Sequence, residues 1–206
     1  MNLPNKLTLL RIFLIPFFLL AFLYENIDTT RLHVLIAHCA ALAIYVGASI
    51  TDYFDGLIAR RDNLITDFGK LVDPVADKLL VLSAFVCFVE LHIFPSWIVI
   101  LIFAREFLVT ALRAVGASKG RVIQADWWGK YKMGSQTVTI VTALVCMIVR
   151  DALMISGDWS ASADNGYWGT HVWISTLLMI LVVLCAVLTV ISGVHYLLCN
   201  RDLIKE

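Results

Sequence analysis

The chain has 206 residues, of which 60% are hydrophobic and only 16% are charged, and its mean hydropathy is +0.85. Ordinary soluble domains contain about 45–50% apolar and about 25% charged residues, so this composition excludes a disordered chain, a disulfide scaffold and a nucleic-acid-binding domain with a basic surface. Sixteen basic residues balance sixteen acidic ones, so only the placement of the charges is informative about partners.

Six apolar runs separated by polar segments follow one another along the chain. Each is close to the length of about 20 residues that a membrane-spanning helix needs, and none shows the alternating pattern of a β-barrel strand. Helices and closed barrels alone satisfy the backbone in lipid. We therefore predict an all-α integral membrane protein with six transmembrane helices and a single membrane domain over residues 1–206. The runs are 7–24, 32–50, 79–94, 97–117, 138–154 and 172–198.

The distribution of Lys and Arg predicts the orientation of these spans. With the N-terminus inside, fourteen of the sixteen basic residues fall on the inner side, and only Arg31 and Arg150 fall on the outer side. The positive-inside rule then places both termini and the segments 51–78 and 118–132 in the cytoplasm. We expect a multi-pass protein of the cell membrane, inner or plasma.

Four aspartates between positions 52 and 77 follow the spacing D-x2-D-G-x2-A-R-x8-G-x3-D-x3-D. Asp52 and Asp55 are three residues apart and Asp73 and Asp77 are four apart, so each pair lies on one helical face. The flanking spans have similar lengths and run in opposite directions, which brings both pairs to the cytoplasmic edge. Crowded carboxylates there take up protons or bind cations, and an all-oxygen set suits Mg²⁺ or Mn²⁺.

Two such ions would form a clamp for the charge of a phosphoryl-transfer transition state, and one carboxylate left partly free would accept a proton from the nucleophile. Beside the acidic pairs, Gly56 and Ala59 remove side chains and would let a ligand approach, while Arg60 is placed to hold a phosphate. The structural alternative is that the small residues permit close helix packing, Asp73 caps a helix and Arg60 is a solvated helix end. Their joint occurrence at fixed spacing favours the functional interpretation.

A second group of charges lies on the fourth and fifth predicted spans. Glu106 and Arg113 fall on one face of the fourth with Arg105 adjacent, and Lys130 and Lys132 open the fifth. Charged side chains at a span are costly without a partner or a polar cavity. Either these residues neutralise one another and contact anionic lipid, or Arg113, Lys130 and Lys132, together with Arg105, bind the phosphate of a water-soluble acceptor. The second interpretation makes a phosphorylated polyol the acceptor.

At the aspartate motif the sequence resembles the CDP-alcohol phosphatidyltransferase family, whose signature has the same order of Asp, Asp, Gly, Ala, Arg, Gly, Asp and Asp. The resemblance implies a dinuclear metal site on the four aspartates, with Asp77 as the catalytic base. It further implies a donor pocket for the cytidine diphosphate group, formed by Gly56, Arg60 and Gly69 beside Ala59. Members of this family are often homodimers, so a second copy is an expected partner together with membrane lipid.

Three further stretches are similar to family members that use sn-glycerol 3-phosphate as the acceptor. These stretches are residues 104–113, residues 129–132 with Gln136, and the opening with Pro4, Asn5, Thr8 and Arg11. Met133 departs from the Thr that those members usually carry. The resemblance implies transfer of a phosphatidyl group from CDP-diacylglycerol to sn-glycerol 3-phosphate at the cytoplasmic face, with release of CMP.

Two alternatives stay open. In the first alternative the protein transfers the same phosphatidyl group, but the acceptor is inositol phosphate, serine or phosphatidylglycerol. In a different class, the intramembrane carboxylates line the path of a divalent-cation transporter, which requires acidic groups at the middle of the bilayer and a route to both faces.

Overall fold

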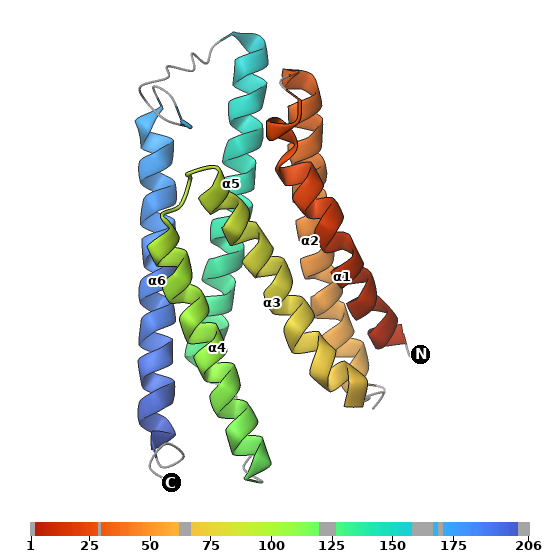
Figure 1. The fold of residues 1–206 in the computed structure, drawn as a ribbon, viewed down its shortest axis with the longest axis vertical. Coiled ribbons are helices and arrows are strands. Elements are labelled where there is room, and N and C mark those ends of the chain that lie inside the picture. The colour runs from red at the N-terminus through yellow and green to blue at the C-terminus, as the bar shows by residue number, and fades with distance from the viewer. Residues whose placement is uncertain are drawn as a thin grey trace.

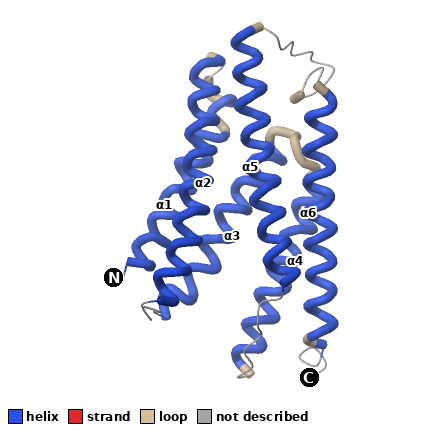
Figure 2. The backbone as a smooth tube through the Cα atoms, turned by 180° about the vertical axis from the view of Figure 1, so that it is seen from behind, coloured by secondary structure: helices blue, strands red, loops and turns tan. Residues whose placement is uncertain are grey.

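The computed structural model describes residues 3–28, 30–61, 67–119, 127–157, 167–168 and 171–201. Its side chains are described over these ranges except at residues 3–7, 52–61, 67–74, 77 and 128. The described part contains six α-helices and one short 3-10 helix, with no strand (Figure 2). The elements are α1 (Leu3–Phe22), η1 (Tyr24–Asn26), α2 (Arg31–Arg61), α3 (Asp67–Glu90), α4 (Ser96–Ser118), α5 (Trp127–Ser156) and α6 (Val172–Cys199).

The helices form an elongated bundle with two groups (Figure 1). In the first group α1 packs against α2 and α3, and in the second α4 packs against α6. α5 joins the two groups because it packs against both α2 and α6. The start of α1 and the end of α6 lie toward the same end of the bundle (Figure 1).

Buried aromatic rings hold the first group together. Phe18 and Phe22 of α1 and Phe85 and Phe88 of α3 have no exposed surface. The rings of Phe22 and Phe88 have centroids 5.0 Å apart and an interplanar angle of 80°, which is the favourable edge-to-face arrangement. The first and third apolar runs thus supply a core between helices.

Large apolar side chains also cover the outside of the bundle. Phe13 is 64% exposed, and Ile100 and Leu198 are each 65% exposed. An outer surface of this kind needs an apolar partner, and a lipid bilayer covers helices of this length. By length and composition, three segments of the described residues are apolar enough to cross a membrane, namely Arg31–Thr51, Gly129–Ser156 and Val172–Cys199, and Thr8–Phe22 is a shorter apolar helix. These helices support a membrane-embedded protein, while the number of six spans stays a prediction.

A tight turn connects α3 to α4. His92 has a positive φ of 56°, the Ile93 amide donates to the Phe88 carbonyl over 2.9 Å, and the His92 amide donates to the Val89 carbonyl over 3.0 Å. This is the Schellman pattern that ends many helices, and Phe88 and Ile93, both buried, stand at the two positions whose apolar contact accompanies it. The predicted span 79–94 therefore ends at Glu90 as a helix, and its last four residues form the turn that sends α4 back along the bundle.

Candidate functional site

The four aspartates of the predicted metal site lie on α2 and α3, on either side of the connection 62–66. Asp55 comes six residues before the end of α2, and Asp73 comes six residues after the start of α3. Asp52 and Asp77 are nine and ten residues from the same helix ends. At about 1.5 Å per residue, the inner members of the two pairs are about 9 Å, and the outer members about 14–15 Å, along their helices from the connection.

The two aspartate pairs are thus at similar distances along α2 and α3 from the connection, as a shared cation site requires, and all-oxygen ligands are those that Mg²⁺ or Mn²⁺ prefer. Among the described side chains, no three His, Cys, Asp or Glu residues are grouped closely enough to hold a metal. The motif's own side chains lie outside the described residues, so their roles stay predictions. They are those of Asp52, Asp55, Gly56, Ala59, Arg60, Gly69, Asp73 and Asp77.

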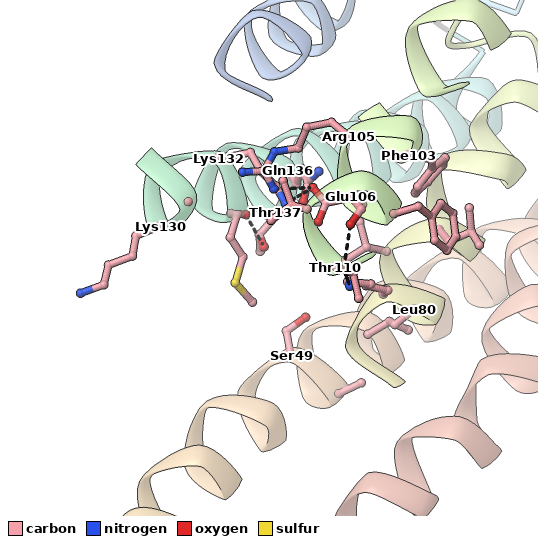
Figure 3. Close-up of a pocket in the computed structure, with 18 of the residues that line it drawn as sticks. Ser49, Leu80, Phe103, Arg105, Glu106, Thr110, Lys130, Lys132, Gln136 and Thr137 are labelled. Carbon is pink, nitrogen blue, oxygen red and sulfur yellow. Dashed lines mark hydrogen bonds and ion pairs between the residues drawn. The ribbon is translucent and has the colours of Figure 1, made fainter. Parts of the chain in front are cut away.

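A cavity of about 510 Å³ lies beside the aspartate-bearing segments. Ser49, which comes one turn before Asp52, and Lys78, which directly follows Asp77, both line it. The facing wall comes from α4 and α5, and Figure 3 shows Glu106 and Gln136 on that side opposite Ser49. The cavity therefore lies between the two helix groups, next to both ends of the aspartate motif. Polar side chains from both groups line it.

All four basic residues of the predicted acceptor site line this cavity, namely Arg105, Arg113, Lys130 and Lys132. Two of them meet at one carboxylate, since the Lys132 ammonium donates to Glu106 Oε1 and Arg105 Nη1 lies 3.5 Å from the same oxygen. The side chains of Lys132, Arg105 and Glu106 are 8%, 12% and 15% exposed. At this burial their charges are screened much less than those of surface pairs.

The other two cations are held by aromatic rings. The Arg113 guanidinium lies 5.6 Å from the centroid of the Tyr196 ring of α6, and the Lys130 ammonium lies 4.6 Å from that of Trp127. Both distances are within the range of cation–π attraction. Figure 3 shows the Lys130 side chain extending away from the Arg105 and Lys132 group, so Lys130 stands at the rim of the cavity.

Two neighbouring residues of α6 position Arg105. The Ser192 hydroxyl accepts a hydrogen bond of 2.5 Å from Arg105 Nη2. At Gly193, an added Cβ would lie 2.8 Å from Arg105 Cγ, so the absence of a side chain is what lets the arginine stem lie against α6. Ser192 and Gly193 thereby determine where the guanidinium enters the cavity.

Several lining residues were not among the predicted site residues. Lys78 of α3 donates a hydrogen bond to the Thr110 hydroxyl of α4, and Arg11 reaches the cavity from α1. Glu106 and Gln136 complete the polar wall. Glu106 and Gln136 share a helical face with Arg113 and Lys132 at spacings of seven and four residues, and this periodicity was the available signal for both.

The opposite end of the bundle carries a second ionic network, centred on Glu25 of η1. Its carboxylate accepts hydrogen bonds of 2.5 and 3.1 Å from the Arg150 guanidinium and one of 3.1 Å from the Tyr167 hydroxyl, and Arg31 Nη1 lies 3.5 Å away. Burial raises the pKa of Glu25, but the hydrogen bonds and charge of Arg150 and the bond from Tyr167 outweigh it and lower the pKa below its usual 4.5. Arg31 and Arg150, the two basic residues that the positive-inside rule predicts on the outer side, therefore both contact this carboxylate.

A buried histidine lies next to this network. His38 Nδ1 of α2 is 2.5 Å from Asp151 Oδ2 of α5, and neither side chain has exposed surface. The other ring nitrogen, Nε2, lies 3.2 Å from the Phe22 carbonyl, so that nitrogen is the donor to the backbone. The network ties α2 to α5 and to the end of α1.

Comparisons with known proteins agree with the motif. The family model described as CDP-alcohol phosphatidyltransferase matches residues 1–198. A Bacillus subtilis protein named CDP-diacylglycerol–glycerol-3-phosphate 3-phosphatidyltransferase is 45% identical over 149 residues, which cover 70% of this chain and 77% of the relative. An Escherichia coli protein of the same name is 34% identical over 211 residues, covering 100% and 98%. A Mycobacterium tuberculosis protein named probable phosphatidylglycerophosphate synthase is 45% identical over 139 residues, covering 68% and 64%.

Proposed function

The chain belongs to the CDP-alcohol phosphatidyltransferase family, and from this premise we propose that it transfers the phosphatidyl group of CDP-diacylglycerol to sn-glycerol 3-phosphate. The products are phosphatidylglycerophosphate and CMP. The names of the relatives support this acceptor. The single observation that carries the proposal is the cavity, whose cationic wall lies next to the segments that bear the aspartate motif.

The cationic wall suits the phosphate of the acceptor. A cavity of about 510 Å³ falls within the range of about 300–1,000 Å³ typical of small-molecule sites. Arg105 and Lys132 present partly buried N–H donors there, and charge-assisted hydrogen bonds to phosphate are the strong ones. Arg113 and Lys130 extend the positive potential to the rim, which attracts an anion from the cytoplasm.

On the other side, we propose that Asp52, Asp55, Asp73 and Asp77 hold two divalent ions, Mg²⁺ or Mn²⁺. Such ions neutralise the charge on a pyrophosphate during phosphoryl transfer. Gly56, Ala59, Arg60 and Gly69 bind the cytidine diphosphate group. The similar distances of the two aspartate pairs from the α2–α3 connection, counted along each helix, support one shared site rather than two separate ones.

Asp77 acts as the general base of the reaction. Its carboxylate accepts the proton of the acceptor hydroxyl, whose oxygen forms a bond to the phosphorus that carries the diacylglycerol. The bond from this phosphorus to the CMP oxygen breaks, and CMP leaves. Lys78, which follows Asp77 in the chain, lines the cavity and places a positive charge in it.

The membrane setting follows from the same arrangement. We propose six spans with both termini and the active site at the cytoplasmic face of the cell membrane, and a homodimer as the assembly. Three long apolar helices and an apolar outer surface support the embedding. The start of α1, the end of α2, the start of α3 and the ends of α4 and α6 lie toward one end of the bundle, the lower one in Figure 1.

The test uses the purified protein in detergent micelles with CDP-diacylglycerol and a divalent metal. Separate reactions contain sn-glycerol 3-phosphate, inositol phosphate, serine or phosphatidylglycerol, and CMP release and the lipid product are measured. Of the four acceptors, we expect only sn-glycerol 3-phosphate to support CMP release. Release with another acceptor and none with sn-glycerol 3-phosphate would overturn the acceptor, and release without divalent metal would overturn the metal requirement.

A further inference from the structure

The neutral side chain of Gln136 presents a buried donor in the cavity that has no hydrogen-bond partner within the described part of the chain. Gln136 of α5 is 4% exposed and lines the cavity, yet its amide nitrogen Nε2 makes no hydrogen bond there. A buried donor that has given up water without gaining an acceptor destabilises the fold. Native structures contain few such groups, and each calls for an explanation such as an absent ligand.

The surroundings of Gln136 identify the chemistry of that ligand. Lys132 lies one turn earlier on the same face of α5 and contacts Glu106, which also lies near Arg105. Figure 3 shows Gln136 beside this charged group. The two cationic side chains, Arg105 and Lys132, suit a phosphate, whereas a neutral carboxamide, which both donates and accepts, matches a hydroxyl group. The ligand therefore carries a phosphate and a hydroxyl a few bonds apart.

We propose that Gln136 is a specificity-determining residue that donates a hydrogen bond to the C2 hydroxyl of sn-glycerol 3-phosphate. This inference rests on the proposed function. The phosphate at one end of the three-carbon chain lies at Arg105 and Lys132, and the reacting C1 hydroxyl at the other end must reach Asp77 of α3. The middle hydroxyl is then the one left for a residue on the α5 wall.

The test combines a residue change with a substrate change. Gln136→Met keeps the side-chain length but removes the amide, and 3-hydroxypropyl phosphate keeps the phosphate and the reacting hydroxyl but lacks the C2 hydroxyl. With sn-glycerol 3-phosphate we expect the variant to show an apparent KM about tenfold higher, the loss typical of one neutral hydrogen bond. With 3-hydroxypropyl phosphate, wild type and variant should have the same KM, because the hydrogen bond is already absent.

Thermal unfolding without substrate distinguishes this role from a structural one. Because Gln136 Nε2 has no protein partner within the described residues, the apolar variant should unfold at the same temperature as wild type or at a higher one. Thr139→Val is the matched control on α5. The Thr139 side chain is buried and donates a hydrogen bond of 2.8 Å to the Ser135 carbonyl. It lies outside the cavity lining, so the Thr139→Val variant should keep the wild-type KM for sn-glycerol 3-phosphate.

The outcomes separate the two levels of the proposal. An unstable Gln136→Met variant, an unchanged KM for sn-glycerol 3-phosphate, or equal losses with both acceptors would overturn the role of Gln136 and leave the transferase proposal standing. A wild-type protein that releases no CMP with sn-glycerol 3-phosphate would overturn the proposed function itself, and with it this assignment.

Discussion

Gly193 offers a direct way to move Arg105 without changing any charged residue. In Gly193→Ala, the new methyl group would lie 2.8 Å from Arg105 Cγ and 3.7 Å from Nε. The clash is with the middle of the side chain, and the guanidinium is held by Ser192 over 2.5 Å. The arginine must therefore leave α6 and lose its position in the cavity.

Two opposing effects determine the stability of this variant. Overpacking costs about 1–3 kcal/mol, while replacing glycine by alanine in a helix gains about 1 kcal/mol. The expected net destabilisation is about 0–2 kcal/mol, which leaves a folded protein. Loss of one charge-assisted hydrogen bond to the substrate phosphate, about 1.5–3 kcal/mol, corresponds to a rise of about 10- to 150-fold in the KM for sn-glycerol 3-phosphate.

The assay measures initial rates of CMP release against sn-glycerol 3-phosphate at saturating CDP-diacylglycerol. The KM for the lipid donor should change little, because Arg105 lies on the acceptor side of the cavity. Gly134→Ala on α5 is the control, since no atom lies within 4 Å of its added Cβ, and it should retain the wild-type KM. A folded Gly193→Ala variant with an unchanged KM for sn-glycerol 3-phosphate would refute the placement of Arg105 at the acceptor phosphate.

Three more predictions concern other parts of the chain. Asp77→Asn should lower kcat by at least about 100-fold with an unchanged melting temperature, and turnover near the wild-type rate would contradict the role of Asp77 as base. Because the pKa of Glu25 is lowered, the ionised Glu25 carboxylate stabilises the folded protein above pH 4.5, and this stabilisation is lost as the pH falls below that value. Melting temperatures measured from pH 7 to pH 3 should therefore decline less steeply in Glu25→Gln than in wild type. His92→Gly should raise the melting temperature by about 1–4 °C. Glycine removes the strain of the left-handed backbone conformation, about 1–2 kcal/mol, and this gain exceeds the cost of the extra chain entropy that glycine loses on folding. A lower melting temperature would show that the His92 side chain stabilises the turn.

The helical fold could be predicted from sequence because hydropathy is a local property. The runs 32–50 and 172–198 each fall within one helix, since about 20 consecutive apolar residues have few other stable arrangements. The predicted span 79–94 was four residues too long at its end, because α3 ends at Glu90 and the apolar residues Leu91, Ile93 and Phe94 belong to the α3–α4 turn. The positive φ at His92 that ends α3 has no sequence signal, as glycine is the usual residue there.

The convergence of Arg105, Arg113, Lys130 and Lys132 on one cavity was predicted in outline, because helix periodicity and the cost of charges in a span both limit where they point. The contacts that orient them were not. Gly193 lies 88 positions from Arg105, and Asp151 lies 113 positions from His38. Pairs at such separations depend on how helices pack, and no local pattern encodes that packing.

α5 carries residues of both polar regions of the bundle, the cavity wall and the ionic network around Glu25 and His38. Lys132 and Gln136 face the cavity near one end of the helix, and Arg150 and Asp151 bind Glu25 and His38 near the other, about 20–28 Å away at about 1.5 Å per residue. A cavity between helix groups leaves few contacts across it, so the groups need a firm connection elsewhere. The buried contacts of Asp151 and Arg150 supply that connection, and removing one partner of a buried ionic contact costs about 3–5 kcal/mol. These contacts therefore hold α5 to α2 and to η1 at the end of α5 that is remote from the cavity.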